Sequence, residues 1–171
     1  MIYITADHHF GHANIIKHCD RPFDTVAEMD ECLADNWNGV VGPNDTVYHL
    51  GDLVCYSNRR PKLNGNITLV WGNHDKAASR RLARDVVQYL EIVIGGREIV
   101  LFHYPIFSWR GKNHGSIHLY GHSHRHQVLM GCRAFNVGVD NWSYTPMAIE
   151  EAVGQALANE HRAHLLTEEE R

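Results

Sequence analysis

Short apolar runs, each followed directly by polar residues, recur along the chain. They are rich in β-branched and aromatic residues, which favours strands over helices. Such runs predict strands at residues 1–5, 46–50, 66–71 and 116–121. Residues 86–104 predict two strands around the turn at Gly95 and Gly96, and residues 126–138 predict a final hairpin that turns at Gly131.

Stretches with helical periodicity separate these strands. In residues 24–40 a cap at Asp24 or Thr25 precedes apolar side chains on one face, namely Val26, Met29, Leu33 and Trp37. Shorter helices are expected at residues 13–19 and 79–85, and a terminal helix at residues 145–165. Thr145 is the expected cap of that last helix, with Pro146 at its first position and fraying at residues 167–171. This order of elements predicts one α/β domain over residues 1–171.

Residues typical of metal ligands follow five of the predicted strands. They are Asp7 with His9, Asp52, the run Asn73, His74 and Asp75, then His103, and finally His122 with His124. Singly, Asp7 with His9 and Asp52 are more typical of turns, and His103 of a buried core histidine. Sites in sheets flanked by helices, however, gather at the carboxyl ends of strands. Residues two apart in extended backbone share a face, so we expect the paired side chains to point the same way.

The donor types indicate which metals the site would hold. Histidine is abundant, with 14 copies. Apart from His74 and Asp75, the set offers two carboxylates, one amide and four imidazoles. Mixed nitrogen and oxygen donors favour Mn, Fe, Co, Ni or Zn over Ca or Mg. Two divalent ions would make the pocket positive although the chain carries a formal net charge of −4, which suits an anionic phosphate ester.

The order D-x-H, G-D, G-N-H-D, H and G-H-x-H resembles the calcineurin-like metallophosphoesterase superfamily. The stretches DHHFGHANIIKHCDRPF and VGPNDTVYHLGD further resemble small stand-alone bacterial and phage phosphoesterases. The resemblance implies a four-layer αββα sandwich of two mixed sheets flanked by helices, with a dinuclear site at one edge. It also implies two divalent metal ions, of which Mn²⁺ is the first expectation.

The resemblance also implies a role for each motif residue. The first ion would be held by Asp7, His9 and His124, the second by Asn73, His103 and His122, and Asp52 would bridge the two. His74 would be the non-ligand histidine that protonates the leaving oxygen, and Asp75 would orient its ring. No arginine matches a phosphate clamp. His8, His12 and His49 either contact and orient the ligands or are ordinary polar residues, and His126 is expected to be exposed.

These roles predict a phosphodiesterase that cleaves small phosphodiesters or nucleotides by in-line attack of a hydroxide held between the metals. A phosphomonoesterase and a nuclease remain alternatives, and a non-catalytic metal-bound scaffold is a weaker one. A nuclease could use the basic residues 57–62 and 79–84 and stack bases on Trp71, Trp109 and Trp142. The acidic chain does not favour binding to long nucleic acid.

Composition indicates the class of protein and the compartment in which we expect it. Hydrophobic residues make up 44% and charged residues 21% of the chain, as in soluble proteins. The four cysteines are widely spaced, which predicts free thiols in a reducing compartment. No apolar run approaches the length of a membrane span, so we expect a cytoplasmic protein. The apolar face of the terminal helix leaves a homodimer open.

Overall fold

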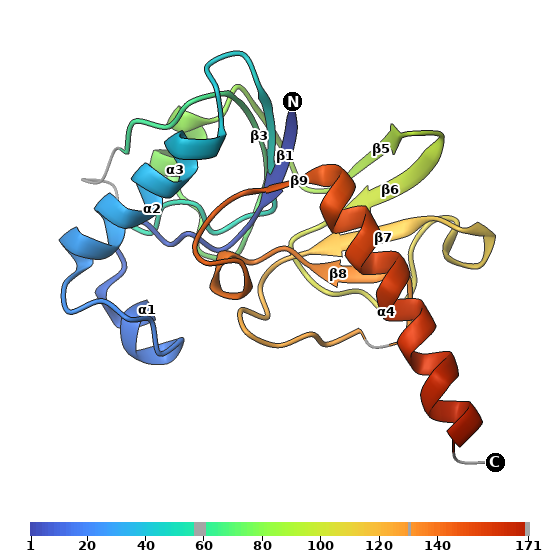
Figure 1. The fold of residues 1–171 in the computed structure, drawn as a ribbon. Coiled ribbons are helices and arrows are strands. Elements are labelled where there is room, and N and C mark those ends of the chain that lie inside the picture. The colour runs from blue at the N-terminus through green and yellow to red at the C-terminus, as the bar shows by residue number, and fades with distance from the viewer. Residues whose placement is uncertain (57–60, 130, 170–171) are drawn as a thin grey trace.

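Two mixed β-sheets form the centre of the protein (Figure 1). Its structure, a computed structural model, describes residues 1–56, 61–129 and 131–169. The first sheet has the order β4-β3-β2-β1-β9, with β1 (Ile2–Thr5), β2 (Thr46–His49), β3 (Asn66–Val70), β4 (Asp85–Val87) and β9 (Met147–Ala148). The second has the order β5-β6-β7-β8, with β5 (Leu90–Ile94), β6 (Arg97–Leu101), β7 (Ile117–Tyr120) and β8 (Ala134–Asn136).

Parallel pairing brings the carboxyl ends of the strands to one edge. In the first sheet β1, β2, β3 and β4 are parallel, and Thr5 lies opposite His49 in register. In the second sheet β6, β7 and β8 are parallel. A bridge between Ala6 and Gly138 joins the end of β1 to the end of β8. The loops that follow these strands in both sheets therefore meet at this edge.

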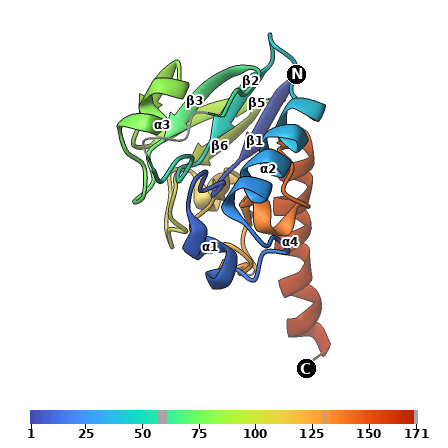
Figure 2. The ribbon, with the colours of Figure 1, turned by 90° about the vertical axis from the view of Figure 1, so that its left-hand side faces the viewer.

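Helices cover the outer face of the first sheet. They are α2 (Val26–Val40) and α3 (Ala77–Leu82), with the short α1 (Ala13–His18) near the end of β1 (Figure 2). Thr25 caps α2, because its Oγ1 accepts a hydrogen bond from the Glu28 amide at 3.1 Å. The predicted apolar face is confirmed: Met29, Leu33 and Trp37 are fully buried, whereas Val26 is half-buried.

A shared apolar core lies between the two sheets. Ile4 of the first sheet packs in one cluster with Leu101 and Leu119 of the second. The helix α4 (Ile149–Glu169) adds Ile149, Ala152 and Ala156 to this cluster and packs against β7 and β8. Asn159 of α4 donates to the Ala134 carbonyl at 2.9 Å, which ties the helix to the edge strand β8. The predicted α/β sandwich of two mixed sheets flanked by helices is thus confirmed.

The predicted final hairpin is wrong. Residues 126–129 form no strand, Met130 lies outside the described residues, and β8 pairs in parallel with β7 instead. Local alternation favoured a hairpin, but Gln127 turns its amide to the Ala134 carbonyl, and the Tyr120 hydroxyl accepts from the Val128 amide. Side chains, rather than a strand ladder, therefore hold this connection.

Three predicted boundaries also differ. The third helix begins at Ala77 rather than at residue 79, and residues 85–87 form β4 of the first sheet, separate from the β5–β6 hairpin. The terminal helix begins at Ile149, because Met147 and Ala148 pair antiparallel with β1 before the helix starts. Thr145 is therefore not its cap. Two short 3₁₀ turns, Lys112–His114 and Val139–Asn141, complete the described elements.

In the described parts of the chain, no helix has both the length and the apolar character of a membrane span. The longest, α4, has 21 residues, and its first turn carries Glu150 and Glu151.

Candidate metal centre

Five of the predicted ligands lie in the left-handed region of backbone conformation. Their φ values are 62° for Asp7, 57° for His9, 59° for Asp52, 66° for His122 and 48° for His124. The expectation of extended backbone at the two pairs is therefore wrong. Such φ values are uncommon outside glycine, and strain of this kind clusters at functional sites. The fold holds these side chains in place against local preference.

Asp7, His9 and His124 form the first cluster. One donor atom from each lies within 4.8 Å of the others, and Asp7 and His9 are buried. The His122 amide donates to both Asp7 oxygens, at 2.8 and 3.1 Å. A Cβ atom at Gly121 would come within 2.8 Å of Asp7 Oδ2, so glycine is needed for the carboxylate to sit there.

Asp52 lies between this cluster and His103. Its Oδ2 is 3.5 Å from His9 Nε2 and 3.6 Å from His103 Nε2. Its Oδ1 accepts from the His74 amide at 2.7 Å. A Cβ at Gly72 would lie 2.4 Å from the same Oδ1, so this glycine leaves space for the carboxylate. One oxygen of Asp52 thus faces two imidazoles from opposite sheets.

His103, Asn73 and His122 form the second group. His103 Nδ1 donates to the Leu50 carbonyl at 2.7 Å, which leaves the lone pair on Nε2. That nitrogen is 2.9 Å from Asn73 Oδ1, and His122 Nδ1 is 3.1 Å from the same oxygen. The lone pair of His103 Nε2 therefore faces the Asn73 oxygen, and a shared cation would stabilise this pair.

The residues present fit divalent metal ions. His9 Nε2 is buried and has no hydrogen-bond partner, while its Nδ1 is 3.1 Å from Cys55 Sγ. An unpaired buried nitrogen beside a carboxylate is costly unless a cation or proton joins them. The imidazole and carboxylate donors together match the preferences of Mn, Fe, Co, Ni and Zn.

Burial and neighbouring charges alter the protonation of this cluster. Burial raises the pKa of Asp7 to about 7 and also raises the pKa of Asp52. Burial lowers the pKa of His9 and of His103. Burial opposes the charged form of His124, but hydrogen bonds to Asp140 and Cys19 and the Asp7 charge raise its pKa to about 10. Metal binding must therefore displace protons from this cluster.

Arg21 and Asp140, which the sequence did not indicate, support the first cluster. Asp140 Oδ2 lies 2.8 Å from His124 Nδ1, so the Nε2 of that ring is left for a metal. Arg21, only 4% exposed, donates to both Asp140 oxygens at 2.8 and 3.0 Å. It also donates to the carbonyls of Asp7 and His8 at 2.7 and 2.9 Å. Arg21 lies in a stretch quoted for the resemblance but in no ligand motif, and Asp140 lies outside the quoted stretches, so only the fold reveals their contacts.

His74 and Asp75 are placed differently from one another. His74 is exposed, and its ring centroid lies 5.3 Å from that of His9. The buried Asp75 carboxylate accepts from the amides of Asp52, Leu53 and Gly72, at 2.8, 2.9 and 2.8 Å. These bonds engage both its oxygens, so Asp75 fixes the loop that carries Asp52.

Four further histidines fall into three environments. His8 and His49 are fully buried and form a side-chain contact of 2.9 Å, beneath Phe10 and Trp37. His12 lines the pocket above the clusters, with its ring 5.9 Å from that of His74. His126 is exposed, as predicted. The histidine excess therefore serves both the centre and the packing beneath it.

The fold and the donor set define a metal-dependent phosphoesterase. Residues 1–140 match the Calcineurin-like phosphoesterase superfamily domain, and the chain belongs to this family. Membership places the protein among hydrolases that act on phosphoesters, and it confirms the resemblance seen in the motifs. The family uses divalent metals, which agrees with the clusters described above.

Several relatives share most of their length with the chain. It is similar to uncharacterized protein MJ1445 of Methanocaldococcus jannaschii, with 36% identity over 162 residues that cover 87% of each chain. It is also similar to the Gene 66 protein of Mycobacterium phage L5, with 28% identity over 82% of this chain and 86% of the phage protein. A solved structure, the protein of unknown function AQ665 from Aquifex aeolicus, matches with a TM-score of 0.73 and 27% identity, over 88% of this chain and 96% of that one.

Proposed function

We propose that the protein is a dinuclear phosphodiesterase. One ion would be held by Asp7, His9 and His124, the other by Asn73, His103 and His122, with Asp52 between them. The observation that carries this proposal is the single Asp52 oxygen, 3.5 Å from a histidine of the first group and 3.6 Å from a histidine of the second. A carboxylate in that position can serve two ions at once.

The chain's own residues supply the remaining chemistry. When bound, two divalent ions would neutralise charge on the phosphate and acidify the attacking water. His74, exposed at the mouth of the pocket, donates a proton to the departing oxygen. Asp75 accepts from the amides of Asp52 and Gly72, so it ties the loop after β2, which carries the bridging carboxylate, to the loop after β3, which carries His74.

Room for a second ester arm favours diesters over monoesters. An open pocket of about 690 Å³ lies over the clusters and includes Asp52, His74 and His122 in its lining. A phosphate monoester would fill only a part of this volume. We propose Mn²⁺ as the working metal, because it accepts mixed nitrogen and oxygen donors; Fe, Co, Ni and Zn share that property.

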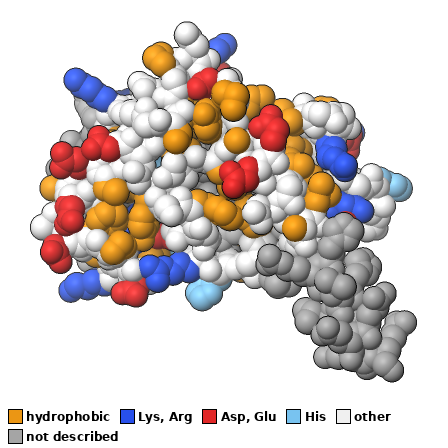
Figure 3. Space-filling model, viewed as in Figure 1, with side chains coloured by type: hydrophobic (Ala, Val, Ile, Leu, Met, Phe, Trp, Pro, Cys, Tyr) orange, Lys and Arg blue, Asp and Glu red, His pale blue; other side chains and the backbone are white. Residues whose placement is uncertain are grey.

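A small substrate fits the surface better than a long nucleic acid. On the face shown in Figure 3, the acidic and basic side chains of the described residues are mixed with one another. Trp109, one of the expected stacking residues, is 7% exposed and packs in a core cluster with Val100 and Tyr120. Trp71 and Trp142 are half-buried and pack against other clusters, and residues 57–60 lie outside the described residues.

The test compares bis(p-nitrophenyl) phosphate with p-nitrophenyl phosphate on the Mn²⁺-loaded protein. We expect preference for the diester, and loss of turnover together with loss of both metals in Asp52→Asn by elemental analysis. Preference for the monoester would make the protein a phosphomonoesterase. Turnover of neither ester would favour a metal-bound scaffold, and two full metals in Asp52→Asn would refute the bridging role.

A further inference from the structure

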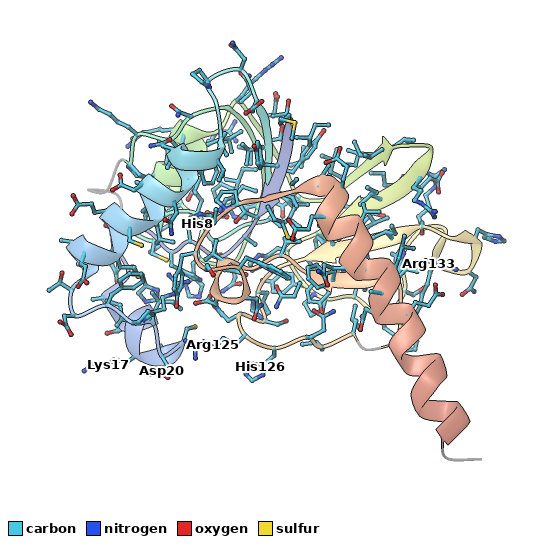
Figure 4. The ribbon with its side chains drawn as sticks, in the orientation of Figure 1. His8, Lys17, Asp20, Arg125, His126 and Arg133 are labelled. Carbon is cyan, nitrogen blue, oxygen red and sulfur yellow. The ribbon has the colours of Figure 1, made fainter. Side chains whose placement is uncertain are left out.

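The pocket extends well beyond the predicted metal ligands. Its volume of about 690 Å³ lies in the range of sites that enclose an organic ligand rather than a lone phosphate. The extension has two walls, one from α1 and the residues just after it, the other from residues 123–126. Figure 4 shows Lys17 and Asp20 of the first segment beside Arg125 and His126 of the second, along one edge of the molecule.

The α1 wall combines apolar surface with imidazole rings. His12, Ile15, His18 and Cys19 line the pocket, at the spacing of three to four residues that places side chains on one helix face. Ile15 and Cys19 are 4% and 8% exposed, so they form an apolar base. His18 is exposed above them, and His12 is half-buried, with its Nδ1 buried and unpaired.

The opposite wall presents a guanidinium that is already held in place. Arg125 Nη2 donates to the Asp20 carbonyl, and its Nη1 lies 3.7 Å from Asp20 Oδ2. The side chain therefore reaches across to the end of α1, with His126 beside it in the lining. A fixed guanidinium plane can stack on a heterocyclic ring and still present N–H donors at its edge.

We propose that this extension is a nucleoside subsite, and that the substrate is a nucleotide diester whose base and sugar lie between α1 and Arg125. The proposal rests on the proposed phosphodiesterase function and adds the substrate class. A nucleoside has flat faces for the imidazoles and the guanidinium, an apolar ring surface for Ile15, and polar edges for N–H donors. We assign it to a free nucleotide rather than a nucleic acid, because the chain carries a net charge of −4.

Two esters with the same leaving group test this subsite on the Mn²⁺-loaded protein. They are thymidine 5′-(p-nitrophenyl phosphate) and methyl p-nitrophenyl phosphate, which differ only in the nucleoside arm. We expect kcat/KM to favour the nucleoside ester by about tenfold or more, since stacking on one base has an effect of that order. The variant His18→Ala with Arg125→Ala should lower this ratio by about tenfold.

Lys17→Ala is the matched control, because Lys17 is exposed on the same helix and does not line the pocket. It should leave the ratio unchanged. Equal kcat/KM for the two esters in the unmodified protein, or an unchanged ratio in the double variant, would overturn the subsite while leaving the phosphodiesterase intact.

Binding measurements separate the subsite from catalysis. If neither ester is hydrolysed, the proposed function fails, and calorimetry with thymidine 5′-monophosphate and inorganic phosphate decides the subsite. At least tenfold tighter binding of the nucleotide, lost in the double variant, would support it; equal binding would overturn it. Tighter competition by a single-stranded oligothymidylate than by the free nucleotide would overturn the assignment to a free nucleotide.

Discussion

At the scale of single residues, the centre depends on which nitrogen of each histidine is left for a metal. His103 Nδ1 donates a hydrogen bond to the Leu50 carbonyl, and His124 Nδ1 lies 2.8 Å from Asp140 Oδ2. In both rings the Nε2 atom is left for a metal. These bonds orient the donors before any metal arrives, which reduces the cost of assembling the site.

Replacing Asp140 should therefore weaken the first metal site without emptying the second. We expect Asp140→Asn to lower the affinity for one of two Mn²⁺ ions by about 10- to 100-fold, as changes to groups behind a ligand usually do. Stepwise titration followed by calorimetry measures this. Asp85→Asn is the matched control, since Asp85 is exposed on β4. Equal weakening of both ions would contradict the assignment of His124 to one of them.

His74 can be tested through the leaving group. We expect His74→Ala to lower the hydrolysis rate of a diester with an alkoxide leaving group by about 10²–10⁴, because that oxygen needs a proton to depart. A p-nitrophenolate ester should lose far less, and the metal content should stay at two. His114→Ala, at another exposed histidine, is the control. Equal losses for both leaving groups would count against proton donation.

The elements divide into those with a clear pattern and those without one. The strands β1, β2 and β3 and the helix α2 could be predicted, because their apolar residues follow the period of the element. The strand β9 has two residues, too few for a pattern. The strand β8 lies within the predicted hairpin, but its parallel pairing with β7 is set by tertiary contacts. Local sequence was equally insufficient for the metal centre. The ligand types could be predicted from the motifs, but the left-handed backbone of the ligands and the burial of Arg21 result from the assembled fold.

The cap of α2 offers a test at this scale. We expect Thr25→Ala to lower the free energy of unfolding by about 1 kcal/mol, because the Glu28 amide loses its acceptor. Urea unfolding measures the change. Metal content and turnover should not change, since α2 contributes no predicted ligand. Thr25→Ser should restore the stability, and failure to do so would show that the methyl group matters more than the cap.

For the whole molecule, the protonation of the centre links stability to pH. The pKa of His124 is raised to about 10 from an ordinary value of 6.5, so the folded state holds this proton more tightly than the unfolded chain. The resulting stability is full below pH 6.5 and is lost as pH rises towards 10. The pKa of Asp7 is raised from 3.8 to about 7, so the folded state also becomes less stable as the pH rises from about 4 to 7.

We therefore expect the protein kept in chelator to melt at a lower temperature at pH 9 than at pH 7. The Mn²⁺-loaded protein should show a smaller decrease or none, because the metal binds more tightly once these protons have left. Thermal unfolding at the two pH values measures both trends. Asp140→Asn should flatten the first trend, since it removes a cause of the raised His124 pKa. A chelated protein that gains stability over this range would contradict the assignment.

The core shared by the two sheets supports the prediction of one domain over residues 1–171, which should unfold in a single transition. Ile4, Leu101 and Leu119 pack together across the two sheets, so neither sheet buries its inner face alone.

The bonds of Arg21 have a consequence for the order of events during synthesis. This side chain joins the carbonyl of Asp7 to the carboxylate of Asp140, which lies 119 positions after Arg21. Until Asp140 has left the ribosome, a nascent chain cannot form this contact at the first metal site, even if its earlier strands have formed. Contacts so distant in sequence form late in folding. Metal binding would then require the complete fold, and truncated chains would lack the ions that the proposed hydrolysis needs.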